Sequence, residues 1–247
     1  MGKAISTGCK QTMFIGDRFL VKDGWCEVIK YDDKSNVTVK FDVSGFEAKG
    51  ATYEIRGGTI SDHTVPSVYG VGFLGKQYLR GSEHKYFYNI WTGILERCYN
   101  DCFKSRHPTY NECVVSDAWL DFSVFLEDVR NMKRQEKWEI DKDLLVSGNK
   151  IYGRDFCVFL PREINVQVRS IKPRELPLGV YAKGGKYAVS SSFRNHQYHL
   201  GTFDHVEDAR KCSNEFRKRN ILILAEDYKH LLDERAYAAL INYKESI

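Results

Sequence analysis

The chain has 247 residues, of which 43% are hydrophobic and 28% are charged, a composition ordinary for a globular protein. This composition excludes a collagen-like, a coiled-coil and a disordered chain. Its 37 Lys and Arg residues exceed its 33 Asp and Glu residues by only four, and the excess lies in the last third of the sequence. Residues 166–223 carry 11 basic and 5 acidic side chains, so a polyanionic partner is expected there first.

Several features of the sequence indicate the cellular compartment of the protein and whether it spans a membrane. No apolar run approaches the roughly 20 residues of a membrane span. The first ten residues lack the apolar centre of a signal peptide. The seven cysteines, an odd number in a chain of this length, favour reduced thiols over a disulfide framework. We therefore expect a soluble, cytoplasmic protein with no membrane partner.

The first 75 residues show short apolar alternation interrupted by turn residues. Val37, Val39, Phe41 and Val43 share one face of a predicted strand, and polar residues occupy the other face. We predict a small, barrel-like antiparallel β domain over residues 1–75. Its balanced charge and the lack of a catalytic cluster favour an interaction role, with a host protein as its partner, over direct contact with nucleic acid.

The hydrophobic period changes from two to about 3.6 in the central part, residues 76–170. Two amphipathic helices are predicted, one carrying Trp91 and Leu95 and one carrying Trp119 and Phe122 on the apolar face. The pattern of residues 136–165, which follow, predicts a strand, a Gly-Asn turn, a second strand and a helix that begins at Pro161. The central part is therefore predicted to hold two helices and a β-hairpin followed by a helix.

Residues 171–247 are predicted to form three strands and two helices, after a linker over 171–179 that holds two of the five prolines. A Gly184-Gly185 turn separates the first two strands, and a turn near Asn195 separates the second from the third. Asp204 and Glu207 resemble a capping box at the start of a helix that reaches about residue 220, and a last helix is expected over about 224–243. The whole chain is thus assigned to the α+β class.

Alternation decides what the uncovered face of this three-stranded sheet presents. Val180, Tyr187, Val189 and Leu200 are expected to face the helix. The opposite face should carry basic, hydroxyl, amide and aromatic groups, a mixture that suits phosphates and base edges in a DNA groove. The predicted DNA-binding residues are Tyr181, Lys183, Lys186, Ser190, Ser192, Gln197 and His199, with Arg194 at the turn. The alternative is a solvated sheet face with incidental lysines.

The order GVY, GKYAV, HLGTFD and EDA over about 178–220 closely resembles the AP2 DNA-binding domain. The resemblance implies that the three-stranded sheet binds the major groove of double-stranded DNA. The plant version of the domain is rich in Arg and Trp on that face, whereas Ser190, Ser192 and His199 stand here. The base specificity of the family therefore does not carry over to this chain.

The segment WEIDKDLLVSGNKIYGRDFCVFLPREIN resembles the HNH motif of ββα-metal nucleases, in the version found in phage homing endonucleases. The helical lead-in over about 86–135, with RCY, PTY and F-x-x-F in order, supports the same resemblance. It implies that Asp141 and Asn165 hold one Mg²⁺ or Mn²⁺ ion and that Lys142 occupies the general-base position. Asn149 and Tyr152 would shape the hairpin loop.

Lys142 departs from the family pattern, in which the base is histidine. Lysine keeps its proton at neutral pH unless burial or nearby positive charge opposes it, and Asp141 and Asp143 flank this one. Three interpretations stay open. In the first, Lys142 binds a phosphate while His107 or another group acts as base. In the second, Lys142 is itself an activated base. In the third, the site is degenerate and does not catalyse hydrolysis.

Cys98, Cys102, His107 and Cys113 follow the spacing C-x3-C-x4-H-x5-C, whose residue types could close a zinc site. The spacing is loose, and a C-x2-C pair is absent. Cys98 also shares the apolar face of Trp91 and Leu95, where a thiol acts as a small hydrophobe. The sequence favours thiols over zinc.

Three functions from different classes follow from these patterns. The first is an HNH-type endonuclease that binds duplex DNA and hydrolyses phosphodiester bonds with one divalent cation. The second is a catalytically degenerate DNA-binding or regulatory phage protein on the same scaffold. The third is a module that binds a host protein and has little affinity for DNA.

Overall fold

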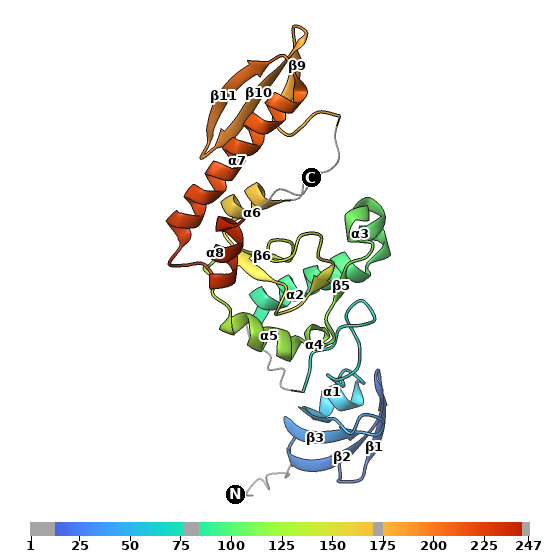
Figure 1. Cartoon of the computed structure of the whole chain (residues 1–247). Coiled ribbons are helices and arrows are strands. Elements are labelled where there is room, and N and C mark those ends of the chain that lie inside the picture. Colours follow the sequence, from blue (N-terminus) through green and yellow to red (C-terminus); the bar gives the residue numbers. More distant parts are fainter. Residues whose placement is uncertain (1–12, 77–83, 170–174, 244–247) are drawn as a thin grey trace, which may run out of the picture. The chain divides into compact units, whose positions relative to one another are not determined.

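The computed structural model describes residues 13–76, 84–169 and 175–243. Helices and short, mostly antiparallel strands occur in separate groups along the chain, so the predicted α+β class is confirmed (Figure 1). The chain divides into two compact units, one formed by residues 1–103 with 117–126 and the other by 104–116 with 127–247. None of the helices in the described ranges is long and apolar enough to cross a membrane.

The first unit opens with an antiparallel sheet in which each strand pairs with the next along the chain. Alternation along the third strand buries Val37, Val39 and Phe41, as predicted, whereas Val43 lies beyond the strand and is 97% exposed. The elements are β1 (Arg18–Val21), β2 (Gly24–Asp33), β3 (Asn36–Phe41), β4 (Glu47–Gly50) and α1 (Thr52–Arg56).

The predicted barrel-like closure of this domain is wrong. In the part of the chain that the structure describes, β1 and β4 are the two edges of an open four-stranded sheet. The chain turns into helix after the four residues of β4, and Ile55 of α1 joins the core made by Val28 and Val39. The helix thus covers the core without a closing pair of strands.

The predicted helix that carries Trp91 and Leu95 is confirmed as α2 (His84–Tyr99), which buries both side chains completely. The next predicted helix is split into α4 (Asp117–Leu120) and α5 (Phe122–Asn131). The break has a visible cause, because Phe73 inserts its backbone there. Its N–H donates to the carbonyl of Leu120 and its carbonyl accepts from the N–H of Phe122, at 3.0 and 2.9 Å.

The second unit holds the predicted hairpin and helix in an altered form. β6 (Glu139–Asp141) pairs antiparallel with β8 (Val158–Leu160), and α6 (Arg162–Val168) follows directly. The expected tight hairpin is wrong, because residues 142–157 form a long loop between the paired strands, and the turn at Gly148 lies inside that loop, closed by the bond from the N–H of Asn149 to the carbonyl of Val146. Within that loop, β7 (Ile151–Tyr152) pairs in parallel with β5 (Val114–Val115). α3 (Asp101–Arg106) and the short 3-10 helix η1 (Pro108–Tyr110) precede β5.

The three predicted C-terminal strands are present as an antiparallel sheet of order β11-β10-β9. Both turns have positive φ at two successive residues, 56° and 77° at Gly184-Gly185 and 49° and 64° at Arg194-Asn195, as tight two-residue hairpins require. The elements are β9 (Val180–Lys183), β10 (Lys186–Phe193), β11 (His196–Phe203), α7 (Val206–Tyr228) and α8 (Glu234–Ile241).

The ends of the C-terminal helices differ from those expected. α7 runs without a break for 23 residues, through the position at which a new helix was predicted, because the sequence there holds neither Gly nor Pro. The expected capping role of Asp204 is also wrong. His205 is the N-cap residue, and the carboxylate of Asp204 pairs with Lys186 at 2.8 Å.

Candidate functional site

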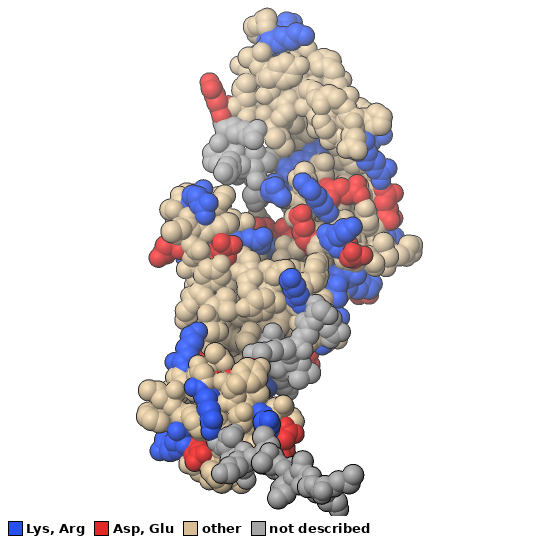
Figure 2. All heavy atoms as spheres, turned by 180° about the vertical axis from the view of Figure 1, so that it is seen from behind, with Lys and Arg blue, Asp and Glu red and all other residues tan. Residues whose placement is uncertain are grey.

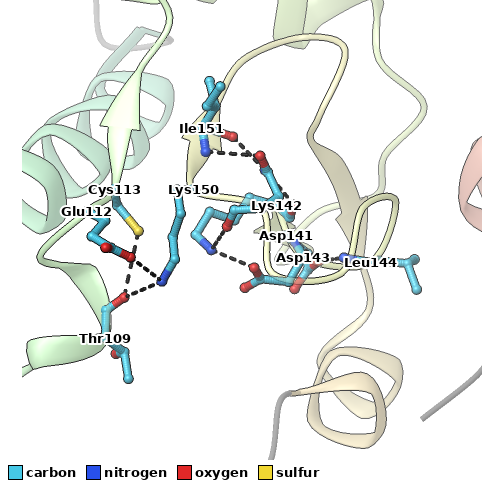
Figure 3. Close-up of polar contacts among 10 residues, drawn as sticks. Thr109, Glu112, Cys113, Asp141, Lys142, Asp143, Leu144, Lys150 and Ile151 are labelled. Carbon is cyan, nitrogen blue, oxygen red and sulfur yellow. Dashed lines mark hydrogen bonds and ion pairs between the residues drawn. The ribbon is translucent and has the colours of Figure 1, made fainter. Parts of the chain in front are cut away.

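Lys142 is turned into the loop that follows β6, and its side chain is only 9% exposed. Its Nζ donates to Oδ1 of Asp143 at 2.6 Å and to the backbone carbonyl of Asn149 at 2.7 Å, as Figure 3 shows. The same ammonium lies 5.9 Å from the ring centre of Tyr152. The side chain of Lys142 thus connects the start of the loop to Asn149 farther along it.

The side-chain amide of Asn149 closes the other half of this loop. Its Nδ2 donates to the carbonyls of Lys142 and Ile151 at 2.8 and 2.7 Å, and its Oδ1 accepts from the N–H of Ile151 at 3.0 Å. Asn149 is nearly buried, so these bonds replace the water that its amide loses. Asn149 and Lys142 thus give the long loop a defined shape at the end of β6.

Asp141 ends β6 and directs its carboxylate back over the start of the loop. Its Oδ1 accepts the N–H groups of Asp143 and Leu144 at 2.9 and 2.7 Å, an arrangement that Asp commonly makes at a turn (Figure 3). Burial raises the pKa of the Asp141 carboxyl, and the bond from Leu144 opposes that rise in part. Its Oδ2 accepts no hydrogen bond from the described residues.

Asn165 lies on α6 and is 8% exposed. Its Nδ2 donates to Oε2 of Glu139 at 2.6 Å, which ties the helix to β6. Glu139 and Asp141 are two residues apart on one strand, so their side chains point to the same face about 7 Å apart. With Nδ2 held by Glu139, the amide oxygen of Asn165 is the atom left for a cation.

Glu139 is the functional candidate that the sequence interpretation missed. Its signal was present, because it precedes Asp141 by two residues on a predicted strand. Carboxylate and amide oxygens are hard ligands, and Mg²⁺ is commonly bound through one or two carboxylates together with water and phosphate oxygens. The oxygen atoms of Glu139, Asp141 and Asn165 are therefore of the chemical type that Mg²⁺ or Mn²⁺ binds.

His107 is exposed and comes directly before η1. The segment that it begins lies against the loop after β6. The Nζ of Lys150 contacts the carbonyl of Thr109 at 3.5 Å and the carboxylate of Glu112 at 3.6 Å (Figure 3). The backbone bond from Val114 to Lys150 continues the same contact. The structure thus places the segment of His107 beside the candidate loop.

The four residues considered for zinc differ in their surroundings. Cys98 and Cys113 are buried, whereas Cys102 and His107 are exposed. Burial raises the pKa of the Cys113 thiol, which disfavours the thiolate that binds metal. Across residues 13–76, 84–169 and 175–243, no three His, Cys, Asp or Glu side chains gather in a group that could hold a metal ion. The three cysteines of this set are therefore not assigned to a metal site.

The strand register places seven of the eight predicted DNA-binding residues on one face of the C-terminal sheet. Residues directly opposite in an antiparallel pair share a face. The pairs Lys186–Lys183, Ser190–His199 and Ser192–Gln197 are opposite, and Tyr181 lies opposite Ala188. The other face packs on α7 through the cluster of Val180, Val189, Tyr187 and Leu200, as expected.

Hydrogen bonds order the polar part of this open face, which we call the outer sheet face. The side chain of Gln197 bonds to the hydroxyls of both Ser190 and Ser192. Lys183 and Lys186 stand at the end of the sheet beside the glycine turn, where Figure 2 shows basic side chains next to a mostly uncharged surface. The face combines donors and acceptors along its middle with positive charge at its end.

Arg194 leaves this face. Its guanidinium pairs with the carboxylate of Asp227 on α7, and it lies 5.1 Å from the ring centre of Phe193.

Comparison of the chain with models of known protein families, with curated proteins and with solved structures finds no match. The residues and their geometry are therefore the basis for a function.

Proposed function

We propose that this protein is an endonuclease that binds duplex DNA through the outer sheet face and hydrolyses a phosphodiester bond at Asp141 and Asn165. The observation that carries the proposal is the hydrogen bond from Asn165 to Glu139, next to Asp141 on the same face of β6. It brings two carboxylates and one amide oxygen from two elements to one place. Of these groups, Asp141 and Asn165 are the pair that the resemblance to ββα-metal nucleases implies for a cation site.

In this proposal, Asp141 and the amide oxygen of Asn165 hold a Mg²⁺ or Mn²⁺ ion. When bound, the ion polarises the phosphate and stabilises the leaving oxygen. Glu139 orients Asn165 through its Nδ2, and the N–H groups of Asp143 and Leu144 orient Asp141. The protein thus supplies a prearranged set of oxygen atoms, which costs little reorganisation during the reaction.

Lys142 is not assigned the role of base. Its Nζ is largely buried and donates to Asp143 and to the carbonyl of Asn149, so it is engaged within the loop. We assign proton acceptance to His107, which is exposed on a segment that Lys150 ties to the same loop. Histidine has the acid–base range that this step needs near neutral pH.

DNA binding is assigned to the outer sheet face. A narrow antiparallel sheet can enter the major groove, where amide and hydroxyl groups read base edges. Gln197, Ser190 and His199 offer such groups, and Lys183 and Lys186 offer positive charge for phosphates. The resemblance to the AP2 domain supports the same assignment.

A second candidate function is a DNA-binding protein on the same scaffold that does not cleave. The observation that favours it is the buried, paired state of Lys142 at the position where the nuclease family has its base. The two candidates agree on DNA binding and differ in hydrolysis.

The experiment that separates them uses supercoiled plasmid with Mg²⁺ or Mn²⁺ over pH 7 to 9.5. We expect nicking by the unaltered protein, and none by Asp141→Ala or Asn165→Ala, with DNA affinity retained in both. Asp155→Ala is the matched control, since it removes an exposed carboxylate from the same hairpin. DNA binding without nicking at any pH would contradict the nuclease and support the second candidate.

A further inference from the structure

Helix α7 packs along its first half against the three-stranded sheet. Ala209 joins Val180 and Val189 in one buried cluster. The ring of Phe216 lies 5.3 Å from that of Tyr198 on β11. These contacts hold the sheet on the helix from the side opposite the outer sheet face.

The second half of α7 packs against the hairpin and α6. The ring centre of Tyr228 lies 6.1 Å from that of Trp138, just before β6, and its hydroxyl donates to the carboxylate of Glu163 on α6. The helix is continuous between its two halves, over 23 residues or about 35 Å. The sheet and the candidate metal site are therefore joined by one helix.

Arg217, near the middle of α7, connects this helix to the end of α6. Its side chain is nearly buried, and it donates from Nε to the carbonyl of Gln167 at 2.6 Å and from Nη2 to that of Arg169 at 2.8 Å. Its guanidinium also lies 5.9 Å from the ring centre of Tyr243. The last carbonyls of a helix lack intrahelical partners and carry partial negative charge, so an arginine placed there satisfies and stabilises them. Arg217 thereby fixes the short helix that carries Asn165.

A separate contact ties the tip of the sheet to the same region. Arg194, in the turn between β10 and β11, pairs with Asp227 of α7. The next residue, Tyr228, bonds to Glu163, which lies two residues before Asn165 on α6. The sheet and α6 are thus linked to α7 at two places along its length.

We infer that Arg217 is a positioning residue that joins the outer sheet face and the Asp141–Asn165 site into one rigid body, so that DNA is cut at a fixed distance from the base pairs that the sheet binds. The inference rests on the proposed function. A flexible connection would let the cut spread over neighbouring phosphates, because each base-pair step is only about 3.4 Å long. The continuous helix α7, bonded to α6 through Arg217, is expected to hold the distance more closely than that step.

The test compares Arg217→Met with the conservative Arg217→Lys, and a glycine pair with an alanine pair at Lys218 and Arg219, which are exposed on α7. Both pairs remove the same charges, but only glycine loosens the helix. The DNA is an end-labelled duplex selected from a random pool by binding to the unaltered protein. A protection footprint and the nick position are mapped on the same molecules.

We expect one sharp nick at a fixed distance from the footprint for the unaltered protein and for the alanine pair. Arg217→Met and the glycine pair should keep the footprint while the nicks spread over several phosphates, and Arg217→Lys should restore part of the sharpness. A nick that stays sharp and in place in Arg217→Met and in the glycine pair would overturn the inference.

A measurement without DNA separates this inference from the proposed function. Spin labels are introduced as non-native amino acids at Thr202, an exposed residue of β11 that lies opposite Ala188, and at Val166, an exposed residue of α6. We expect a narrow distance distribution in the otherwise unaltered protein and a broad one with Arg217→Met. A broad distribution without that substitution would overturn the rigid connection. A narrow one in a protein that neither binds nor nicks DNA would contradict the proposed function and leave the rigid connection supported.

Discussion

The side-chain nitrogen of Asn165 donates a hydrogen bond of 2.6 Å to the carboxylate of Glu139, across 26 residues of sequence. The bond decides which end of the amide is free. It also fixes α6 against the strand that carries Asp141. Glu139 is therefore the residue through which the candidate site is most directly tested.

Glu139→Ala should weaken the response to cation without abolishing the site. Residues that orient metal ligands typically change metal affinity by about 10- to 100-fold. We expect the Mg²⁺ concentration for half-maximal plasmid nicking to rise within that range, with DNA affinity unchanged. Glu136→Ala removes an exposed carboxylate three residues earlier and should leave the Mg²⁺ dependence as it is. An unchanged Mg²⁺ dependence in Glu139→Ala would reject its role in orienting Asn165.

The cation-free protein should become more stable when Asp141 is replaced by Asn. Burial raises the pKa of this carboxyl in the folded state, so its ionised form opposes folding. The folded state therefore favours the protonated carboxyl. Folding carries no penalty from Asp141 below the unfolded-state pKa, and the penalty for the ionised form is complete once the pH has risen through the raised folded-state pKa. We therefore expect Asp141→Asn to raise the free energy of unfolding in EDTA at pH 7 and to have little effect near pH 3.5. Urea unfolding at a series of pH values measures both, and a gain that grows toward low pH would contradict the assignment.

Lys142→Met should destabilise the fold by about 2 kcal/mol, since it leaves the carbonyl of Asn149 without its donor and removes the ion pair with the partly exposed Asp143. Urea unfolding measures the loss. The nicking rate that remains should keep the pH profile of the unaltered protein, because Lys142 does not accept the proton. Loss of the profile's rising limb in Lys142→Met, with the limb intact in His107→Ala, would show that Lys142 is the base after all.

The two lysines at the end of the outer sheet face should contribute unequally to DNA affinity. Lys186 is paired with Asp204 at 2.8 Å, whereas Lys183 has no ion pair within the described residues. Lys183→Ala should weaken binding and lower the salt slope by about 1. Asp204→Asn should strengthen binding, since it frees the charge of Lys186. Affinities over a range of salt concentrations test both, with Lys211→Ala on α7 as the control for loss of an exposed charge.

Local patterns in the sequence predicted much of this structure. Alternation with period two assigned Val180, Val189 and Leu200 to the helix side of the C-terminal sheet, and these residues pack in one cluster with Ala209 of α7. Helical spacing likewise found the buried face of Trp91 and Leu95. These predictions succeed because the period of a strand or helix is set by its own backbone and is written in neighbouring residues. The barrel-like closure failed because it depends on whether distant edges pair.

The sequence by itself determined the α+β class, the three C-terminal strands and which side chains share their open face. Only the tertiary structure decided that Asn165 meets Glu139, that Lys142 is buried against Asp143 and Asn149, and that Arg217 caps α6. The physical reason is the sequence separation between the residues that interact. Periodicity records contacts within a few residues, whereas a side chain's partner on another element depends on how those elements pack, and several partners of the same chemistry are available along the chain.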